Sequence, residues 1–351
     1  MTGGAAEFPS VEEMAEWIGR SDPDAVRELH ERAYALKTEV VGRRVSMRGL
    51  VEAGNVCAKD CLYCGIRKSN AKVERYALSK EEIVACARFA ADAGYGSLVI
   101  QSGEIESEAH TRFIEDVLRE VAPLNLGVTL SLGEQTEDVY LRWRDAGATR
   151  YLLRIETSNP VLYSTLHPAE CSFERRVECL RALRRCGYQV GTGVMAGLPG
   201  QTLEDLARDI VFFRDIDADM IGMGPYIPHP DTPLGAKAQD WSAKRSFILG
   251  LNMIAATRLA LRDVNIAAAT ALQALDPLGR EKGLLAGANV VMPNITDVKY
   301  RSKYKLYADK PCLDENAGLC RNCLQRRIES IGETILWGVP GDSAHFRRRQ
   351  K

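Results

Sequence analysis

The chain has 351 residues, a formal net charge of −1 and 46% hydrophobic residues. This composition is typical of a globular chain long enough for one large barrel or two smaller domains. A charge so near zero gives no field that would attract nucleic acid or an anionic membrane surface, and no apolar run reaches the ~18 residues of a membrane span. The first ten residues lack the basic and apolar regions of a signal peptide. We therefore expect a cytoplasmic protein whose ten cysteines are metal ligands or reduced thiols rather than disulfides.

Two helices are expected before the first strand. Ser10 and Glu13 form the capping box of one helix, and Asp22 begins another that runs towards Val40. The apolar run 46–51 follows as the first strand. Because residues 1–45 precede this strand, we expect them to form a helical cap over the bottom of the domain that follows.

Three cysteines come after the first strand at a spacing typical of a metal site. Cys57, Cys61 and Cys64 lie within eight residues, so one loop can place all three thiolates around a single cluster. A cubane iron–sulfur cluster takes one cysteine per iron, and three ligands leave one iron open, which is typical of a catalytic centre. A zinc knuckle is the alternative, but the next hundred residues offer it only the isolated Cys86 and His110.

From the cysteine loop onward, helical patterns alternate with short apolar runs. The helices are expected at 79–93, 108–121, 136–146, 172–186, 203–216, 243–261 and 279–286. The strands after the first are expected at 98–101, 128–131, 151–154, 189–195, 220–223, 265–268 and 289–292. This alternation predicts an α/β fold with a parallel sheet, and eight strands match a closed (β/α)8 TIM-type barrel over residues 46–293. An open doubly wound sheet is the competing fold, although no G-x-G-x-x-G motif follows the first strand.

Acidic residues follow three consecutive predicted strands, at Glu104, Glu134 and Glu156. Because functional groups of a parallel barrel collect at the carboxyl ends of its strands, we expect these carboxylates near the cysteine loop, unless they cap the next helix. A carboxylate can bind an ammonium group, and a guanidinium binds a carboxylate with two hydrogen bonds. Arg154 and Arg176 are the two candidates for that guanidinium.

A glycine-rich run at 191–202 follows the fifth strand and allows the backbone to approach a ligand closely. It lacks the Gly-Lys-Ser/Thr sequence of a P-loop, so a nucleotide phosphate site of that kind is excluded. After residue 293 the barrel pattern stops, and we expect residues 294–351 to form an extension that folds over one end. This extension contains a second triad, Cys312, Cys320 and Cys323, which suggests another iron–sulfur cluster or, alternatively, reduced structural thiols.

The first triad, with an aromatic residue before its third cysteine, resembles the signature of the radical S-adenosylmethionine superfamily. In that superfamily the open iron of a 4Fe-4S cluster is chelated by S-adenosylmethionine, which is cleaved to a 5′-deoxyadenosyl radical. The resemblance implies that Cys57, Cys61 and Cys64 hold the cluster and that Tyr63 lies near the adenine. It also implies an electron donor such as flavodoxin or ferredoxin.

Further motifs resemble the HydE family of [FeFe]-hydrogenase maturases, which shares its barrel with biotin synthase and methylornithine synthase. They lie at 55–57, 64–67, 101–104, 151–154, 156–157, 197–202, 224–234 and 287–294. HydE members often carry a second cysteine triad, so the triad in the extension favours this family; a methylornithine synthase-like or other biotin synthase-like enzyme is the alternative. Ile155 departs from the family, because some members carry histidine there.

The HydE resemblance implies a role in assembling the diiron subcluster of the hydrogenase H-cluster. Family members act on a cysteine-bound iron complex delivered by the maturase HydG, and pass the product to the scaffold HydF. The residues expected to bind the cofactor are Tyr63, Gln101, Ser131, Glu134, Arg154, Glu156, Arg176, Gly197, Gln201 and Met223. The residues expected to approach the substrate are Thr270, Ala271, Tyr304 and Tyr307.

Overall fold

Helices and short parallel strands alternate along most of the chain in the computed structural model, which describes residues 7–314 and 316–350. The helices are α1 Val11–Gly19, α2 Pro23–Val40, α3 Lys80–Asp92, α4 Glu108–Val121, α5 Glu137–Asp145, α6 Pro160–Leu166, α7 Phe173–Arg185, α8 Leu203–Asp215, α9 Ala243–Leu261, α10 Thr270–Leu275, α11 Gly279–Leu285, α12 Val298–Arg301, α13 Ala317–Ser330 and α14 Ala344–Arg349. The strands are β1 Arg44–Gly54, β2 Ser97–Ser102, β3 Gly127–Ser131, β4 Ala148–Leu152, β5 Gln189–Thr192, β6 Met195–Ala196, β7 Met220–Ile221, β8 Gly224–Pro225, β9 Asn265–Ile266, β10 Val290–Val291 and β11 Thr334–Leu336. Among the helices of these described residues, none is both long and apolar enough to cross a membrane.

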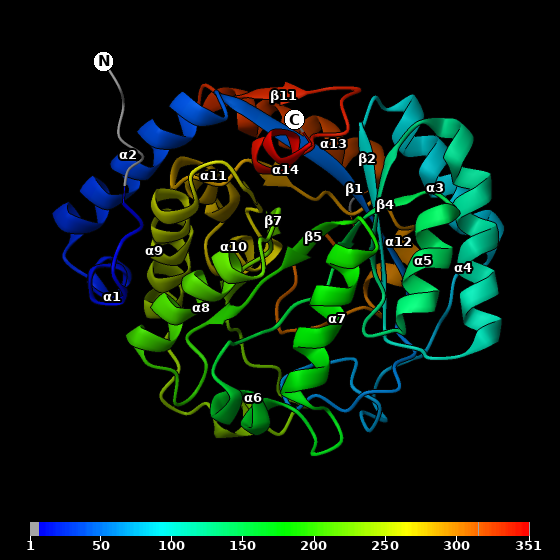
Figure 1. The fold of residues 1–351 in the computed structure, drawn as a ribbon, viewed down its shortest axis with the longest axis horizontal. Helices are drawn as coiled ribbons and strands as arrows, with labels where there is room; N and C mark the ends of the chain where they lie inside the picture. Colours follow the sequence, from blue (N-terminus) through cyan, green and yellow to red (C-terminus); the bar gives the residue numbers. More distant parts are fainter. Residues whose placement is uncertain (1–6, 315, 351) are drawn as a thin grey trace.

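The parallel strands form a closed barrel within the described residues. Their order is β10-β1-β2-β3-β4-β5-β7-β9, and every pairing along it is parallel. The ends of this path meet, because the amide of Asn289 donates to the carbonyl of Ile266 at 2.9 Å and the amide of Ala268 donates to that of Val290 at 2.9 Å. The predicted (β/α)8 barrel is therefore confirmed, and the helices surround it as Figure 1 shows.

Four of the expected strands are shortened or divided. Those at 265–268 and 289–292 are reduced to β9 and β10. The expected strand at 189–195 is divided into β5 and β6, and the one at 220–223 is interrupted before β8. The short strands β6 and β8 pair with each other in a separate two-stranded sheet. Gly193 and Gly222 lie at the two interruptions.

Alternate residues of each strand point into the barrel, so the inward side chains form layers. On β1 these are Arg48 near the amino end, then Leu50, then Glu52 at the carboxyl end. The register places Glu52 beside Gln101 of β2, which in turn lies beside Ser131 of β3. This layer of polar residues forms part of the wall of the cavity described below.

The N-terminal helices do not cover the bottom of the barrel, which corrects the sequence-based expectation. Instead α1 packs against α8 and α9, and α2 packs against α9 and α11, on the outside of the helical layer (Figure 1). Their apolar faces supply buried side chains such as Met14, Trp17 and Leu29. A helix with one apolar stripe can bury it against any other apolar surface, so the sequence does not specify which surface is covered.

The C-terminal extension closes the bottom of the barrel. The carbonyl of Gly341 accepts hydrogen bonds from Arg48 at 3.2 Å and from Asn265 at 2.8 Å, and the carboxylate of Asp342 pairs with Arg150. Strand β11 pairs with the first residues of β1. The extension also reaches the opposite end, where residues 303–310 cover the carboxyl ends of the strands, so it folds over both ends and not over one. In Figure 1, β11 and α14 lie at one end and α6 lies at the other.

Candidate active site

A cavity of about 340 Å³ opens at the carboxyl end of the barrel. Its wall brings together residues from all parts of the sequence, including most of those expected to bind the cluster, the cofactor or the substrate. The predicted residues that line it are Cys57, Cys61, Tyr63, Cys64, Gln101, Ser131, Arg154, Glu156, Arg176, Thr270, Ala271, Tyr304 and Tyr307.

The cysteine loop is held in place by backbone contacts to distant segments. The amide of Leu62 donates to the carbonyl of Leu166 at 2.8 Å, and the amide of Gly65 donates to the carbonyl of Leu306 at 3.0 Å. A Cβ atom on Gly65 would lie 2.1 Å from the carbonyl oxygen of Lys305. Glycine is therefore required directly after the third cysteine, because any side chain would displace the loop from the extension.

The three thiols share the wall of the cavity. Burial raises the pKa of each thiol, that of Cys64 to about 12, and the neighbouring thiols raise the pKa of Cys61 and Cys64 further. Positively charged iron would supply the charge that holds them as thiolates. Among the described residues, no three His, Cys, Asp or Glu side chains form a site for a single metal ion. A cubane cluster attaches each cysteine to its own iron, so its thiols need not converge on one point, and this donor set fits such a cluster.

Glu156 stands beside the cysteine loop in a strained backbone conformation. Its φ of 65° is rare for a residue with a side chain, and such strain is concentrated at functional sites. The conformation is held by hydrogen bonds from its amide to Gly193 at 3.0 Å and from the amide of Met195 to its carbonyl at 3.2 Å. Its carboxylate accepts from Arg154 at 2.9 and 3.1 Å and from the hydroxyl of Tyr63 at 3.5 Å. Glu156 and Arg154 therefore present a carboxylate and a guanidinium together at the cavity.

Arg176 is the second guanidinium of the site, and Glu134 holds it in place. Its Nε donates to Glu134 at 2.6 Å and its Nη1 donates to the carbonyl of Arg154 at 2.6 Å. Glu134 is only 1% exposed and lies behind Arg176, outside the cavity wall. We therefore correct its expected role: Glu134 orients a residue that faces the cavity and does not face it itself.

Three other residues expected at the cofactor lie off the cavity wall. The side-chain oxygen of Gln201 accepts from the amide of Gly197 at 2.8 Å, and its nitrogen donates to the carbonyl of Met195 at 3.1 Å. Gln201 and Gly197 thus shape the loop that carries Met195, and Met195 is the residue that lines the cavity. Met223 is fully buried and its sulfur accepts from Thr257 of α9, so it faces the outer helix and not the cavity.

The residues expected near the substrate lie on the wall formed by α10 and the extension. Thr270 and Ala271 begin α10, and the hydroxyl of Thr270 accepts from Arg280 at 3.2 Å. The hydroxyl of Tyr304 accepts from Gln101 at 3.0 Å, and burial raises the pKa of Tyr307. Segment 303–310 therefore contributes to the cavity wall as well as covering its mouth.

Sequence reasoning missed three charged residues of the wall, which are Glu52, Lys59 and Lys310. Lys59 lies within the cysteine loop and pairs with Glu104 at 3.1 Å. Glu52 interrupts the apolar pattern of β1, and a charged residue on the inward face of a barrel strand is a signal that was available in the sequence. Nothing in the sequence pairs it with Lys310, which is 258 residues away.

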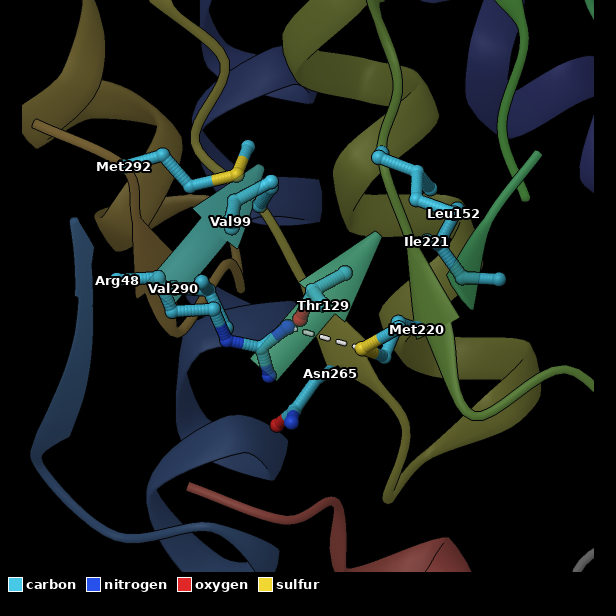
Figure 2. Close-up of a pocket in the computed structure, with 11 residues that line it drawn as sticks. Arg48, Val99, Thr129, Leu152, Met220, Ile221, Asn265, Val290 and Met292 are labelled. Carbon is cyan, nitrogen blue, oxygen red and sulfur yellow. Dashed lines mark hydrogen bonds between the residues drawn. The ribbon is translucent and has the colours of Figure 1, made fainter. Parts of the chain in front are cut away.

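The floor of the cavity is formed by inward residues of the lower strands (Figure 2). Leu152 and Met292 contact both the cavity and a small void below it of about 20 Å³, which is room for one water molecule. Arg48 reaches across this void and donates to the sulfur of Met220 at 2.9 Å. The barrel interior therefore changes from a polar cavity to an apolar floor and then to a basic layer at the bottom.

The second cysteine triad lies outside the barrel, on the extension. Cys320 and Cys323 are one turn apart on α13, and the thiol of Cys320 is hydrogen-bonded with that of Cys312. The side chain of Gln273 donates to Cys312 at 3.8 Å. The structure thus brings Cys312 and Cys320 together, with Cys323 one turn further along α13.

Comparison with known proteins agrees with this barrel. The radical SAM superfamily model matches residues 51–213, and the fold and the three-cysteine loop define the chain as a radical S-adenosylmethionine enzyme. That class implies a 4Fe-4S cluster and S-adenosylmethionine as cofactors. The chain is 45% identical over 304 residues to the [FeFe] hydrogenase maturase subunit HydE of Thermotoga maritima, which covers 87% of this chain and 85% of that protein. The chain therefore belongs to the HydE family.

More distant relatives share the same fold. The chain is 26% identical to a 3-methylornithine synthase of Methanosarcina acetivorans, over 80% of this chain and 78% of that protein. The crystal structure of methylornithine synthase (PylB) has a TM-score of 0.81 at 22% identity and covers 95% of this chain and 96% of its own. HydG from Carboxydothermus hydrogenoformans has a TM-score of 0.80 at 19% identity, covering 98% and 78%. At these identities the two structures support the fold alone.

Proposed function

We propose that this radical S-adenosylmethionine enzyme acts in the maturation of [FeFe]-hydrogenase. Its substrate would be a small organometallic precursor of the diiron subcluster. The observation that carries the proposal is the 45% identity to a HydE maturase together with a cavity that joins the cysteine loop to the wall formed by α10 and the extension. When bound, the cluster and S-adenosylmethionine supply reductive cleavage of the sulfonium and a 5′-deoxyadenosyl radical.

The residues of the chain have distinct roles in this proposal. Cys57, Cys61 and Cys64 would hold the cluster. Glu156 would bind the ammonium group of the methionyl part of S-adenosylmethionine. Arg176, which is held in place by Glu134, would bind the carboxylate of the same part. Arg154 already neutralises Glu156, so binding of the ammonium group would require Arg154 to turn towards the carboxylate as well.

Substrate and partners complete the proposal. The substrate would enter between α10 and segment 303–310, with Thr270, Ala271, Tyr304 and Tyr307 in contact with it. The proposed partners are HydG, HydF and an electron donor such as flavodoxin or ferredoxin, in the cytoplasm. We further propose that Cys312, Cys320 and Cys323 hold a second iron–sulfur cluster, which iron analysis of the Cys320→Ala protein would test.

Two experiments test the proposed function. Anaerobic reconstitution with iron and sulfide, followed by dithionite, should convert S-adenosylmethionine to 5′-deoxyadenosine in the wild type and not in Cys57→Ala. Coexpression with HydG, HydF and an [FeFe]-hydrogenase, in a host that lacks its own maturases, should then give active hydrogenase only when this chain is present. Cleavage without hydrogenase activation would contradict the maturation role and leave the radical enzyme intact.

A methylornithine synthase-like activity is the second candidate, because the fold of that enzyme covers almost the whole chain. It predicts that the reconstituted protein rearranges L-lysine. Absence of any lysine-derived product, under conditions in which S-adenosylmethionine is cleaved, would exclude it.

A further inference from the structure

A buried ion pair lies in the wall of the cavity. Glu52 points inward from β1, and the ammonium group of Lys310 contacts its carboxylate from segment 303–310. The two side chains are 2% and 9% exposed, so neither charge is screened by bulk water. Both residues line the cavity, and each can therefore contact a ligand that enters it.

Each partner has further contacts that fix its position. The second carboxylate oxygen of Glu52 accepts from the side chain of Asn294 at 2.8 Å, and its amide donates to the hydroxyl of Thr296 at 2.8 Å. The ammonium group of Lys310 also donates to the carbonyl of Tyr304 at 2.8 Å. The pair is therefore preorganised, with one negative and one positive group side by side at the cavity wall.

A preorganised buried pair discriminates between ligands by their charge. A ligand with one charge can draw away one partner only, and the other partner is then left buried and uncompensated, which is strongly unfavourable. A ligand that carries both charges replaces the partner of each residue at the same time. A pair of this kind disfavours singly charged ligands relative to zwitterions, which is specificity by penalising the wrong ligand.

Two other ion pairs of the site hold groups that the proposed function assigns to the cofactor. Arg154 pairs with Glu156, which contacts Tyr63 of that loop, and Arg176 is held behind the wall by Glu134. The proposed function already uses these groups for the methionyl part of the cofactor. A third pair, Lys59 with Glu104, belongs to the cluster loop, because Lys59 lies within it and the amide of Glu104 donates to the sulfur of Cys57 at 3.4 Å. The pair of Glu52 and Lys310 is left for the substrate, beside Gln101 and Tyr304.

We propose that Glu52 and Lys310 are specificity-determining residues of the substrate cavity, which exchange their mutual contact for the ammonium and carboxylate groups of an amino-acid-bearing substrate. This inference rests on the proposed function and names the residues that recognise the substrate. Lys310 belongs to segment 303–310, so the carboxylate would be bound at the part of the wall that this segment contributes.

Ligand binding to the reconstituted enzyme with S-adenosylmethionine present tests the proposal. The probes are S-methyl-L-cysteine, 3-(methylthio)propionate and 2-(methylthio)ethylamine, which match in shape and carry both charges, the negative one or the positive one. Calorimetry should show that the wild type binds the zwitterion at least roughly tenfold more tightly than either analogue. The double variant Glu52→Gln/Lys310→Met should lose this preference, with the three affinities within about threefold of one another.

A matched variant controls for the loss of a buried ion pair as such. Lys37 and Glu333 form a fully buried pair outside the cavity, so Lys37→Met/Glu333→Gln should keep the preference of the wild type. The proposal is overturned if the wild type has no preference or binds none of the probes, or if the cavity double variant retains the preference. Reductive cleavage of S-adenosylmethionine by the same wild-type preparation reports on the proposed function separately, so the two failures are distinguishable.

Discussion

Asp209 is a buried carboxyl group that binds the backbone two residues after Glu156. It lies on α8 with no exposed surface, and one of its oxygens accepts from the amide of Ser158 at 2.6 Å. The other oxygen has no hydrogen-bond partner among the described residues. Burial raises the pKa of Asp209 to about 7, although the contact with Ser158 opposes the rise.

The raised pKa makes the stability contribution of Asp209 depend on pH. Between about pH 4 and pH 7 the folded protein keeps a proton on Asp209 that the unfolded chain has released, so this contribution falls as pH rises through that interval. The slope is about 1.4 kcal/mol per pH unit, or roughly 2.5 kcal/mol between pH 5 and pH 8. Asp209→Asn keeps an oxygen that can accept from Ser158 and removes the titration.

The measurement is the apparent free energy of unfolding from urea titrations of the wild type and Asp209→Asn. The wild type should lose roughly 2.5 kcal/mol relative to the variant between pH 5 and pH 8. Asp205→Asn is the control on the same helix: contacts with Thr202 and Asn159 lower the pKa of Asp205 although burial opposes them, so its contribution is lost as pH falls. A difference between wild type and Asp209→Asn that does not change with pH would refute the reasoning.

Three further outcomes follow from the contacts of the site and of the barrel base. Arg176→Lys should weaken binding of S-adenosylmethionine to the reconstituted protein by roughly tenfold or more, because an ammonium group cannot reproduce the two directed bonds of the guanidinium; equilibrium dialysis with unchanged affinity would contradict this. Gly65→Ala should lower the iron content per chain after reconstitution, because its Cβ would lie 2.1 Å from the carbonyl of Lys305, and full iron loading would argue against the role of that contact. Asp342→Asn should lower the free energy of unfolding by roughly 3 kcal/mol in urea titrations, since Arg150 is left buried beside an uncharged side chain. A loss below about 1 kcal/mol would show that Arg150 needs no counter-ion.

Local patterns in the sequence determined the fold class and the core of the site. The alternation of helical and apolar runs predicts the closed barrel. It can be recognised in the sequence because the hydrophobic periodicity of a helix or strand depends on residues only a few positions apart. The spacing of Cys57, Cys61 and Cys64 likewise predicts one loop with three thiols, and the acidic strand ends place Glu104 and Glu156 on the cavity wall. These features are readable because the carboxyl ends of parallel strands meet at one end of a barrel.

Only the tertiary structure decided which distant residues meet. The bottom of the barrel is closed by Gly341 and Asp342 and not by the N-terminal helices, and Glu134 supports Arg176 from behind the wall. The pair of Glu52 and Lys310 joins residues 258 positions apart. Such contacts produce no periodic pattern in the sequence, because they depend on how the extension packs against the barrel. An apolar stripe or a single charged residue also does not specify which residue it will contact.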